Sequence, residues 1–190
     1  SALARRGVKP EALRAFWLEL AITQKDISVP LSSLFSHNTK AIDSTAPRLA
    51  FVRDAVRLPL TGGPDSATLV RYPDQPNKDP RHHDLTSGHV LIEREDAEMA
   101  SFRLKDLVDV DHHEGALHAG STDRKDQRPI VHWTVEAAQS TTLVIAEDDQ
   151  LREVKGRLEP HTHPVGTVVQ LERIGYAILL DDGRLLMTHE

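Results

Sequence analysis

Three polar side chains interrupt an apolar stretch near the end of the chain, "VVQLERIGYAILL". Gln170, Glu172 and Arg173 stand among aliphatic and β-branched residues that predict a strand. In regular alternation Gln170 and Glu172 share one face, and Gly175 predicts a nearby bulge that re-aims a side chain. An amide, a carboxylate and a guanidinium can hydrogen-bond the edges of unstacked bases. The plainer interpretation is an Arg173–Glu172 surface ion pair worth ~0–1 kcal/mol.

Histidine is abundant and suggests a second kind of chemistry, metal binding. Among the 11 histidines, His161 and His163 form a His-x-His motif, as metal-binding barrels use. The next glutamate, Glu172, lies nine residues beyond His163, and Pro164 interrupts the pattern. We interpret these histidines as loop residues on a polar surface and predict no metal site. A metal-dependent β-barrel enzyme that uses His161 and His163 remains the alternative.

Motifs for covalent or nucleotide chemistry are absent from the sequence. The chain has no cysteine, no Gly-x-Ser-x-Gly, no P-loop and no Gly-x-Gly-x-x-Gly. We therefore predict no catalytic residue in this chain and no cofactor bound to it.

Cations recur at the edges of the predicted strands. Several have an apolar or aromatic neighbour, which would suit a barrel that holds a single-stranded RNA loop. The net charge of −6 argues mildly against a general nucleic-acid binder, although binding depends on local patches. A charged, soluble surface, or a protein-interaction domain without ligand chemistry, would give the same pattern.

The elements that must position these residues fall into two parts. Residues 1–48 carry helical signals, with Gly7 as a C-cap and Pro10 at a first helical position. Ser28 and Pro30 signal another helix start, and Pro47 an end. From residue 49, short apolar runs alternate with turn clusters, which predicts an antiparallel β-sandwich or barrel. No apolar run approaches the roughly 20 residues of a membrane span, so we expect a cytoplasmic protein and no membrane partner.

Several motifs, in order along the chain, resemble one known family. The segment "RRGVKPEALRAFW" and the later Asn38-Thr39-Lys40, Ile42-Asp43 and Phe51-Val52 resemble the module that follows the catalytic domain in class I glutamyl- and glutaminyl-tRNA synthetases. The stretches "FRLKDLVDV", "RPIVHWTVEAA" and "GTVVQLERIGY" resemble the family's later strands. Two residues depart from the family pattern, Thr39 where Arg is common and Leu171 where Phe is usual.

This resemblance implies a fold and a boundary for each part. It implies a small helical module (1–48) followed by an anticodon-binding region (49–190) of two antiparallel β-barrels. We expect a proximal barrel at about 49–105 plus 165–190, with a distal barrel at about 106–164 inserted into it. The fold class is therefore mainly β with a helical N-terminal part.

The resemblance also implies a function. The archaeal-type glutamyl enzyme matches better than the glutaminyl counterpart, so the expected partners are tRNA(Glu), through its anticodon loop, and the catalytic domain of a longer parent. That parent would ligate glutamate to tRNA with ATP and Mg²⁺, and the fragment alone would be inactive. The residues expected to contact RNA are Arg48, Arg103, Lys105, Gln170, Glu172 and Arg173, with Lys40 and Arg81 as secondary candidates.

Overall fold

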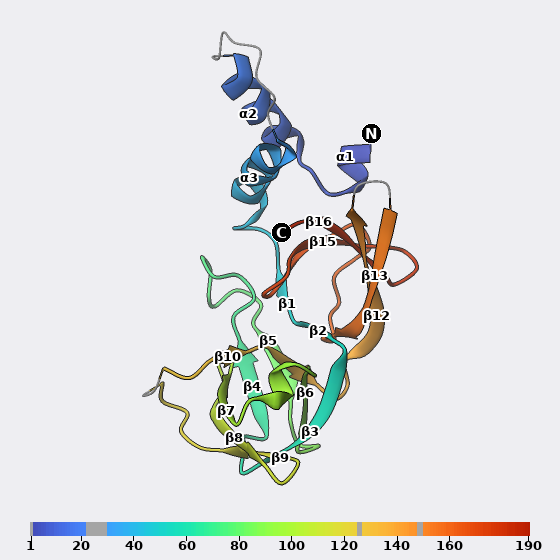
Figure 1. Ribbon diagram of the computed structural model, residues 1–190. Coiled ribbons are helices and arrows are strands. Elements are labelled where there is room, and N and C mark those ends of the chain that lie inside the picture. Colours follow the sequence, from blue (N-terminus) through green and yellow to red (C-terminus); the bar gives the residue numbers. More distant parts are fainter. Residues whose placement is uncertain (1, 22–29, 125–126, 148–149) are drawn as a thin grey trace.

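Three helices lie at one end of the molecule and two β-barrels follow (Figure 1). The computed structural model describes residues 2–21, 30–124, 127–147 and 150–190. The helices are α1 (Ala2–Arg5), α2 (Pro10–Ala21) and α3 (Leu31–Ile42). Gly7, at φ +83, follows the end of α1, and Pro10 is the first residue of α2, as predicted. Ser28 lies outside the described residues.

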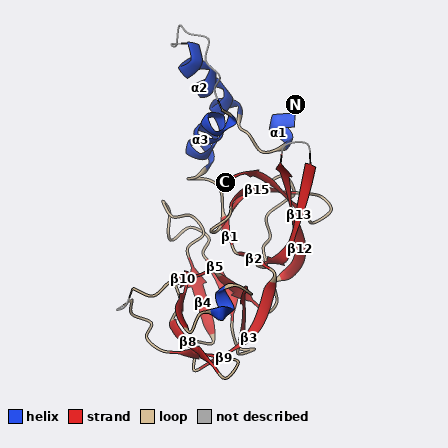
Figure 2. Ribbon diagram, in the orientation of Figure 1, coloured by secondary structure: helices blue, strands red, loops and turns tan. Residues whose placement is uncertain are grey.

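The barrel next to the helices is built from the two ends of the β-rich region (Figure 2). Its seven described strands are hydrogen-bonded in the order β1-β14-β15-β16-β12-β13-β2. They are β1 (Arg48–Leu49), β2 (Phe51–Arg53), β12 (Gln139–Glu147), β13 (Gln150–Leu158), β14 (Val168–Leu171), β15 (Gly175–Leu179) and β16 (Leu185–His189). We call this the C-terminal barrel.

One short segment closes the C-terminal barrel. β1 pairs with β14 at one edge of the sheet, β2 pairs with β13 at the other, and only Ala50 separates β1 from β2. The segment 48–53 therefore belongs to both edges at once, which removes the free edges of the sheet. Ala50 is fixed at the point where the segment passes from one edge to the other. Its N–H donates to the Glu159 side chain at 2.8 Å, and its carbonyl accepts from the Glu159 N–H at 3.0 Å.

A second barrel is inserted between β2 and β12. Its seven described strands have the order β10-β7-β8-β9-β3-β6-β11. They are β3 (Ala55–Thr61), β6 (His89–Glu93), β7 (Ser101–Leu104), β8 (Asp109–His113), β9 (Ala116–Ala119), β10 (Ile130–Val131) and β11 (Trp133–Val135). A two-stranded sheet of β4 (Ser66–Leu69) and β5 (Arg81–Asp84), and the 3-10 helix η1 (Asp96–Glu98), accompany it. We call this the inserted barrel.

The inserted barrel closes in the same way as its neighbour. β10 pairs with β7, β11 pairs with β6, and the single residue His132 separates β10 from β11. Each barrel has its own apolar core, one around Phe102, Val110 and Trp133 and the other around Leu143, Leu171 and Leu185. The fold is therefore mainly β, with a helical N-terminal part and two barrels.

Strand pairing divides the chain between the barrels differently from the expected limits. We expected the distal barrel at about 106–164, whereas the strands of the inserted barrel run from Ala55 to Val135. β12 and β13, placed in the distal barrel by the sequence, pair with β16 and β2 of the C-terminal barrel. The reason is that an alternating pattern identifies a strand and its buried face but does not identify its partner.

Candidate nucleic-acid interface

The polar stretch that ends β14 lies where the two barrels meet. Leu171 is fully buried in the C-terminal core, so the replacement of the family's usual Phe is a change in the core. A tight turn follows β14, with Arg173 at φ +69 and Gly175 at φ +138. A Cβ on Gly175 would lie 2.6 Å from the carbonyl oxygen of His189, so only glycine fits there. This turn aims the side chains of residues 172 and 173 at the inserted barrel.

Arg48 and Gln170 are neighbours across two strands. They are register partners in the parallel pair β1–β14, and the Arg48 N–H donates to the carbonyl of Arg71 at 3.0 Å. Arg48 Nε, a donor, and Gln170 Oε1, an acceptor, are both buried and have no hydrogen-bond partner. An unpaired buried polar atom is costly, so this pair is a place in the C-terminal barrel where hydrogen-bonding capacity is not used by the described residues.

Glu172 is held by two cations from the inserted-barrel side. Lys105 Nζ lies 2.9 Å from its Oε1, and Arg81 Nη2 lies 3.3 Å from its Oε2. Burial raises the pKa of Glu172, but Arg81 and Lys105 outweigh burial and the net shift is downward. Burial likewise opposes the charge of Lys105, yet Glu172 raises the pKa of Lys105 overall. Each of the two groups therefore favours the charged form of the other.

Arg173 does not pair with Glu172. Its Nη1 lies 2.7 Å from Asp96 Oδ2 in η1 of the inserted barrel, and its side chain is 38% exposed. The surface ion pair Arg173–Glu172 considered from the sequence is therefore wrong.

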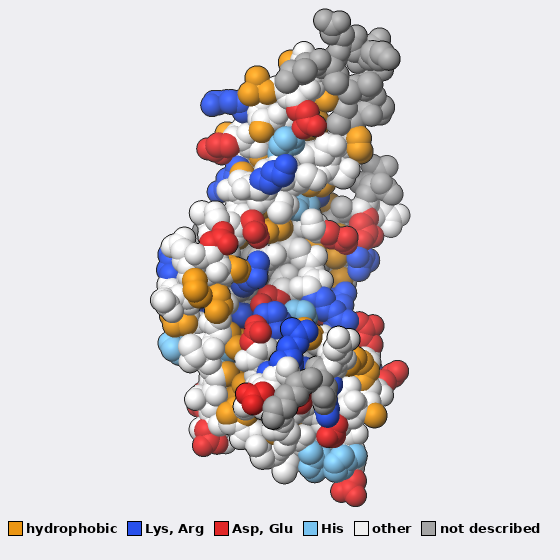
Figure 3. All heavy atoms as spheres, turned by 90° about the vertical axis from the view of Figure 1, so that its left-hand side faces the viewer, with side chains coloured by type: hydrophobic (Ala, Val, Ile, Leu, Met, Phe, Trp, Pro, Cys, Tyr) orange, Lys and Arg blue, Asp and Glu red, His pale blue; other side chains and the backbone are white. Residues whose placement is uncertain are grey.

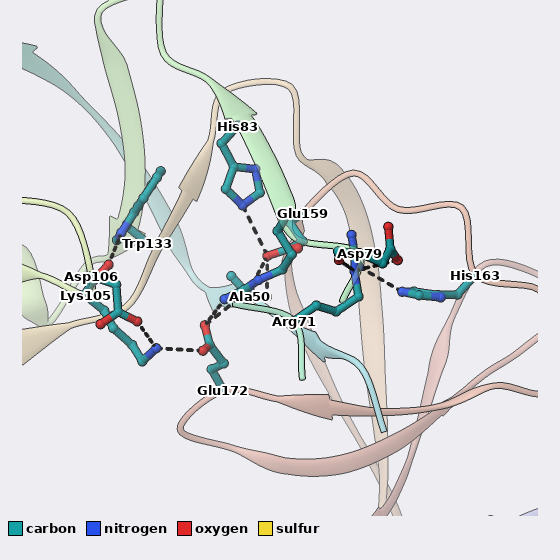
Figure 4. A network of polar contacts seen from close by, with 11 residues as sticks. Ala50, Arg71, Asp79, His83, Lys105, Asp106, Trp133, Glu159, His163 and Glu172 are labelled. Carbon is teal, nitrogen blue, oxygen red and sulfur yellow. Dashed lines mark hydrogen bonds and ion pairs between the residues drawn. The ribbon is translucent and has the colours of Figure 1, made fainter. Parts of the chain in front are cut away.

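A buried ion pair continues this network inward (Figure 4). Arg81 Nη1 donates to Glu159 Oε2 at 2.8 Å, and both side chains are almost completely buried. Burial raises the pKa of Glu159, against the opposing effect of Arg81. His83 Nε2 lies 3.7 Å from the same oxygen, and burial, together with Arg81, lowers the pKa of His83 to about 4. Arg81 is thus engaged inside the protein.

Two other expected residues lie outside this cluster. Arg103 is buried in the inserted barrel, where its guanidinium donates to Asp109 Oδ1 at 2.7 Å and to the Thr122 carbonyl at 2.6 Å. Lys40 is exposed on α3. The structure therefore brings together Arg48 with Gln170, and Lys105 with Glu172 and Arg81, while Arg173 reaches Asp96 from the same turn.

Sequence reasoning missed several residues that organise this region. Asp43 accepts a hydrogen bond from Tyr176 and faces Arg48, Glu159 joins Ala50 to Arg81, and Asp96 holds Arg173. Asp43 stands in the Ile-Asp motif of the family pattern, which was the one available signal for it. Nothing in the local sequence distinguishes Glu159 or Asp96 from ordinary surface carboxylates.

The His-x-His motif does not form a metal centre. Arg71 Nη1 lies 2.9 Å from His163 Nε2, so a guanidinium occupies the position that a metal ion would need. Burial and Arg71 lower the pKa of both His161 and His163. Within residues 2–21, 30–124, 127–147 and 150–190, no group of three or more His, Asp or Glu side chains could hold a metal. The metal-enzyme alternative is therefore not supported.

The surface around this cluster is cationic but mixed. Figure 3 shows Lys and Arg side chains gathered between the two barrels, beside acidic and histidine side chains. Single-stranded nucleic acid is bound by such cationic surfaces together with partners for the bases. Among the described helices, none is both long and apolar enough to cross a membrane.

Comparison with known proteins agrees with this geometry. Residues 46–125 match the model of the anticodon-binding domain of class I tRNA synthetases for glutamate and glutamine. A glutamate–tRNA ligase of Methanocorpusculum labreanum is 34% identical over 97% of this chain and 34% of its own length. Those of Natronomonas pharaonis and Pyrococcus abyssi are each 32% identical, over 93% and 92% of this chain and 32% and 33% of their own lengths.

These relatives also show what the chain covers. It spans about a third of the length of the curated relatives it matches. The matched region includes β1, the inserted barrel up to β9, and the segment around Lys105. The similarity and the two barrels agree with one another: the chain belongs to the anticodon-binding region of class I glutamyl- and glutaminyl-tRNA synthetases.

Proposed function

We propose that this chain binds the anticodon loop of tRNA(Glu), as the RNA-reading part of a longer cytoplasmic glutamate–tRNA ligase. The observation that carries this proposal is the adjacent pair Arg48 and Gln170, whose side chains are partly exposed and whose Nε donor and Oε1 acceptor have no partner among the described residues. The ligation of glutamate, with ATP and Mg²⁺, belongs to the catalytic domain of the longer protein. The chain described here supplies binding and no chemical step.

Arg48 and Gln170 would read one base. A base that leaves the stack offers donors and acceptors along one edge, and this pair presents a guanidinium donor beside an amide that both donates and accepts. A base that satisfies both atoms removes the cost of leaving them unpaired, whereas one with the wrong pattern does not. The pair would therefore discriminate between bases at one anticodon position.

Lys105 and Arg173 would contact the RNA backbone. Both are charged and partly exposed, and each is oriented by a carboxylate, Glu172 or Asp96. Phosphate contacts of this kind fix the position of an RNA without reading its sequence. This assignment differs from the expectation that Arg173 and Glu172 meet the bases, because Glu172 already has two cationic partners.

Gln170→Leu tests the proposed reading pair. Anticodon stem–loops of tRNA(Glu), a copy with the middle anticodon base replaced, and the tRNA(Gln) stem–loop would be titrated against wild type and variant. Gln170→Leu should lose about 1–3 kcal/mol of binding to the tRNA(Glu) stem–loop and most of its preference over the replaced base. Preference for the tRNA(Gln) stem–loop by the wild type would favour the glutaminyl counterpart.

The matched control is Gln139→Leu, an exposed glutamine at the start of β12 in the same barrel. It should bind all stem–loops as the wild type does. If Gln170→Leu also does so, the pair Arg48 and Gln170 does not read a base and the proposal fails.

A further inference from the structure

Asp43 connects the helical module to the strands that carry the proposed base-reading pair. It directly follows α3, and its N–H donates to the Thr39 carbonyl at 2.8 Å. The hydroxyl of Tyr176 donates to Asp43 Oδ1 at 2.5 Å. Tyr176 is buried in β15 and is the register partner of Gln170 across the β14–β15 pair. The Asp43 carboxylate is therefore fixed at a defined place beside Gln170's strand.

The same carboxylate oxygen faces Arg48. Arg48 Nη2 lies 3.9 Å from Asp43 Oδ1, and among the described residues no other side chain pairs with the Arg48 guanidinium. The backbone of Arg48 is already held by β14 and by the Arg71 carbonyl. The remaining freedom of Arg48 lies in its side chain, and Asp43 limits that freedom.

This contact contributes little to the stability of the fold. The N–O distance is 3.9 Å and the two side chains are 29% and 47% exposed, so the pair is too long and too exposed to solvent to stabilise the barrel appreciably. It leaves Arg48 Nε unpaired, and the Arg48 side chain as a whole remains 29% exposed. A nearby charge that favours one orientation of a guanidinium without saturating its donors is what a preorganised recognition site requires.

We propose that Asp43, held by the Tyr176 hydroxyl, is a positioning residue that orients the Arg48 guanidinium for the base it reads. The proposal rests on the proposed function, because it assigns a role relative to the base-reading pair. Asp43 touches no base itself. It acts by holding Arg48 in the conformation that binding requires, so that the cognate base does not have to order this side chain.

Two near-isosteric substitutions separate positioning from structural support. Asp43→Asn keeps an acceptor for Tyr176 and removes the charge that faces Arg48. Tyr176→Phe removes the hydrogen bond to Asp43 and keeps the charge. If Asp43 served only to anchor α3 to the barrel, Tyr176→Phe would be the damaging change, and it would lower stability without altering base preference.

The experiment titrates the same stem–loops against the whole chain. Asp43→Asn should lose about threefold to tenfold in affinity for the tRNA(Glu) stem–loop, with a smaller loss for the copy with the replaced base. In an Arg48→Ala background the same change should have no further effect, because Asp43 acts through Arg48. The denaturation midpoint of Asp43→Asn should equal that of the wild type. The control Asp65→Asn, at an exposed position, should also unfold at the wild-type midpoint.

The outcomes distinguish this inference from the proposed function. If the wild type prefers the tRNA(Glu) stem–loop and Gln170→Leu abolishes that preference, but Asp43→Asn binds as the wild type does, only the positioning role fails. Additive losses for Asp43→Asn and Arg48→Ala would also overturn it. If the wild type shows no preference at all, the proposed function fails and the positioning role fails with it.

Discussion

Glu172 shows what a sequence can and cannot say about a single residue. Its carboxylate, inside an apolar strand, indicated a special environment, and the structure places it between Lys105 and Arg81. These partners are 67 and 91 positions away in the sequence, so no local pattern could identify them. The chemistry of the residue was predictable, whereas its partners depend on how two barrels meet.

Arg103 is the residue for which the structure changes the expectation most. Its guanidinium is buried against Asp109, so Arg103→Ala would leave an unpaired buried carboxylate. We expect a loss of about 3–5 kcal/mol in the free energy of unfolding, measured by chemical denaturation. The control Arg94→Ala breaks an exposed pair with Asp54 and should cost only ~0–1 kcal/mol. A stable Arg103→Ala protein that binds RNA poorly would instead support the expected role of Arg103 as a residue that contacts RNA.

At the scale of elements, helix limits were easier to predict than barrel closure. Gly7 and Pro10 mark a helix end and a helix start because a cap and a fixed φ act locally. β1 and β10 have two residues each, and each is followed after one residue by a strand that pairs at the opposite edge. In the sequence such a segment looks like one continuous strand. The change of pairing partner within it depends on strands that the rest of the chain places at the two edges.

Gly156→Ala tests the closure of the C-terminal barrel. A Cβ at Gly156 would lie 2.5 Å from Phe51 Cζ and 2.7 Å from the Val52 carbonyl oxygen, where β13 pairs with β2. We expect the substitution to push these strands apart and cost about 1–3 kcal/mol of unfolding free energy. Gly120→Ala is the control, because its Cβ would meet only the Asp109 carbonyl oxygen at an ordinary 3.6 Å. Equal stability of both variants would argue against close packing of β2 on β13.

At the scale of the whole molecule, charged contacts join two separate apolar cores. Arg53 of β2 pairs with Glu93 of β6 at 2.7 Å, and Arg173 with Asp96 adds a second link between the barrels. Ion pairs need defined geometry, so these contacts favour one relative orientation of the barrels. The base-reading pair and Arg173 belong to the C-terminal barrel, whereas Lys105 belongs to the inserted barrel, so the spacing between Lys105 and the pair depends on this junction.

Acid should weaken this molecule through its buried and partly buried histidines. Burial lowers the pKa of His83 to about 4, and it also lowers the pKa of His132, His161, His163 and His189. At these histidines the unfolded chain therefore binds more protons than the folded chain below about pH 6.5. The stability that neutral histidines provide is complete above about pH 6.5 and is lost as the pH falls toward about 4.

His83→Gln isolates the largest of these contributions. For His83 the loss should reach up to about 3 kcal/mol by pH 4, because its ordinary pKa is near 6.5. The raised pKa of Glu159 acts with the opposite sign, so the variant must be compared with the wild type at each pH. Chemical denaturation between pH 7.5 and pH 4.5 should show a flatter decline for His83→Gln than for the wild type, whereas His82→Gln, on the exposed face of β5, should follow the wild type. Parallel curves for His83→Gln and the wild type would mean that His83 is not buried against Arg81 and Glu159 as described.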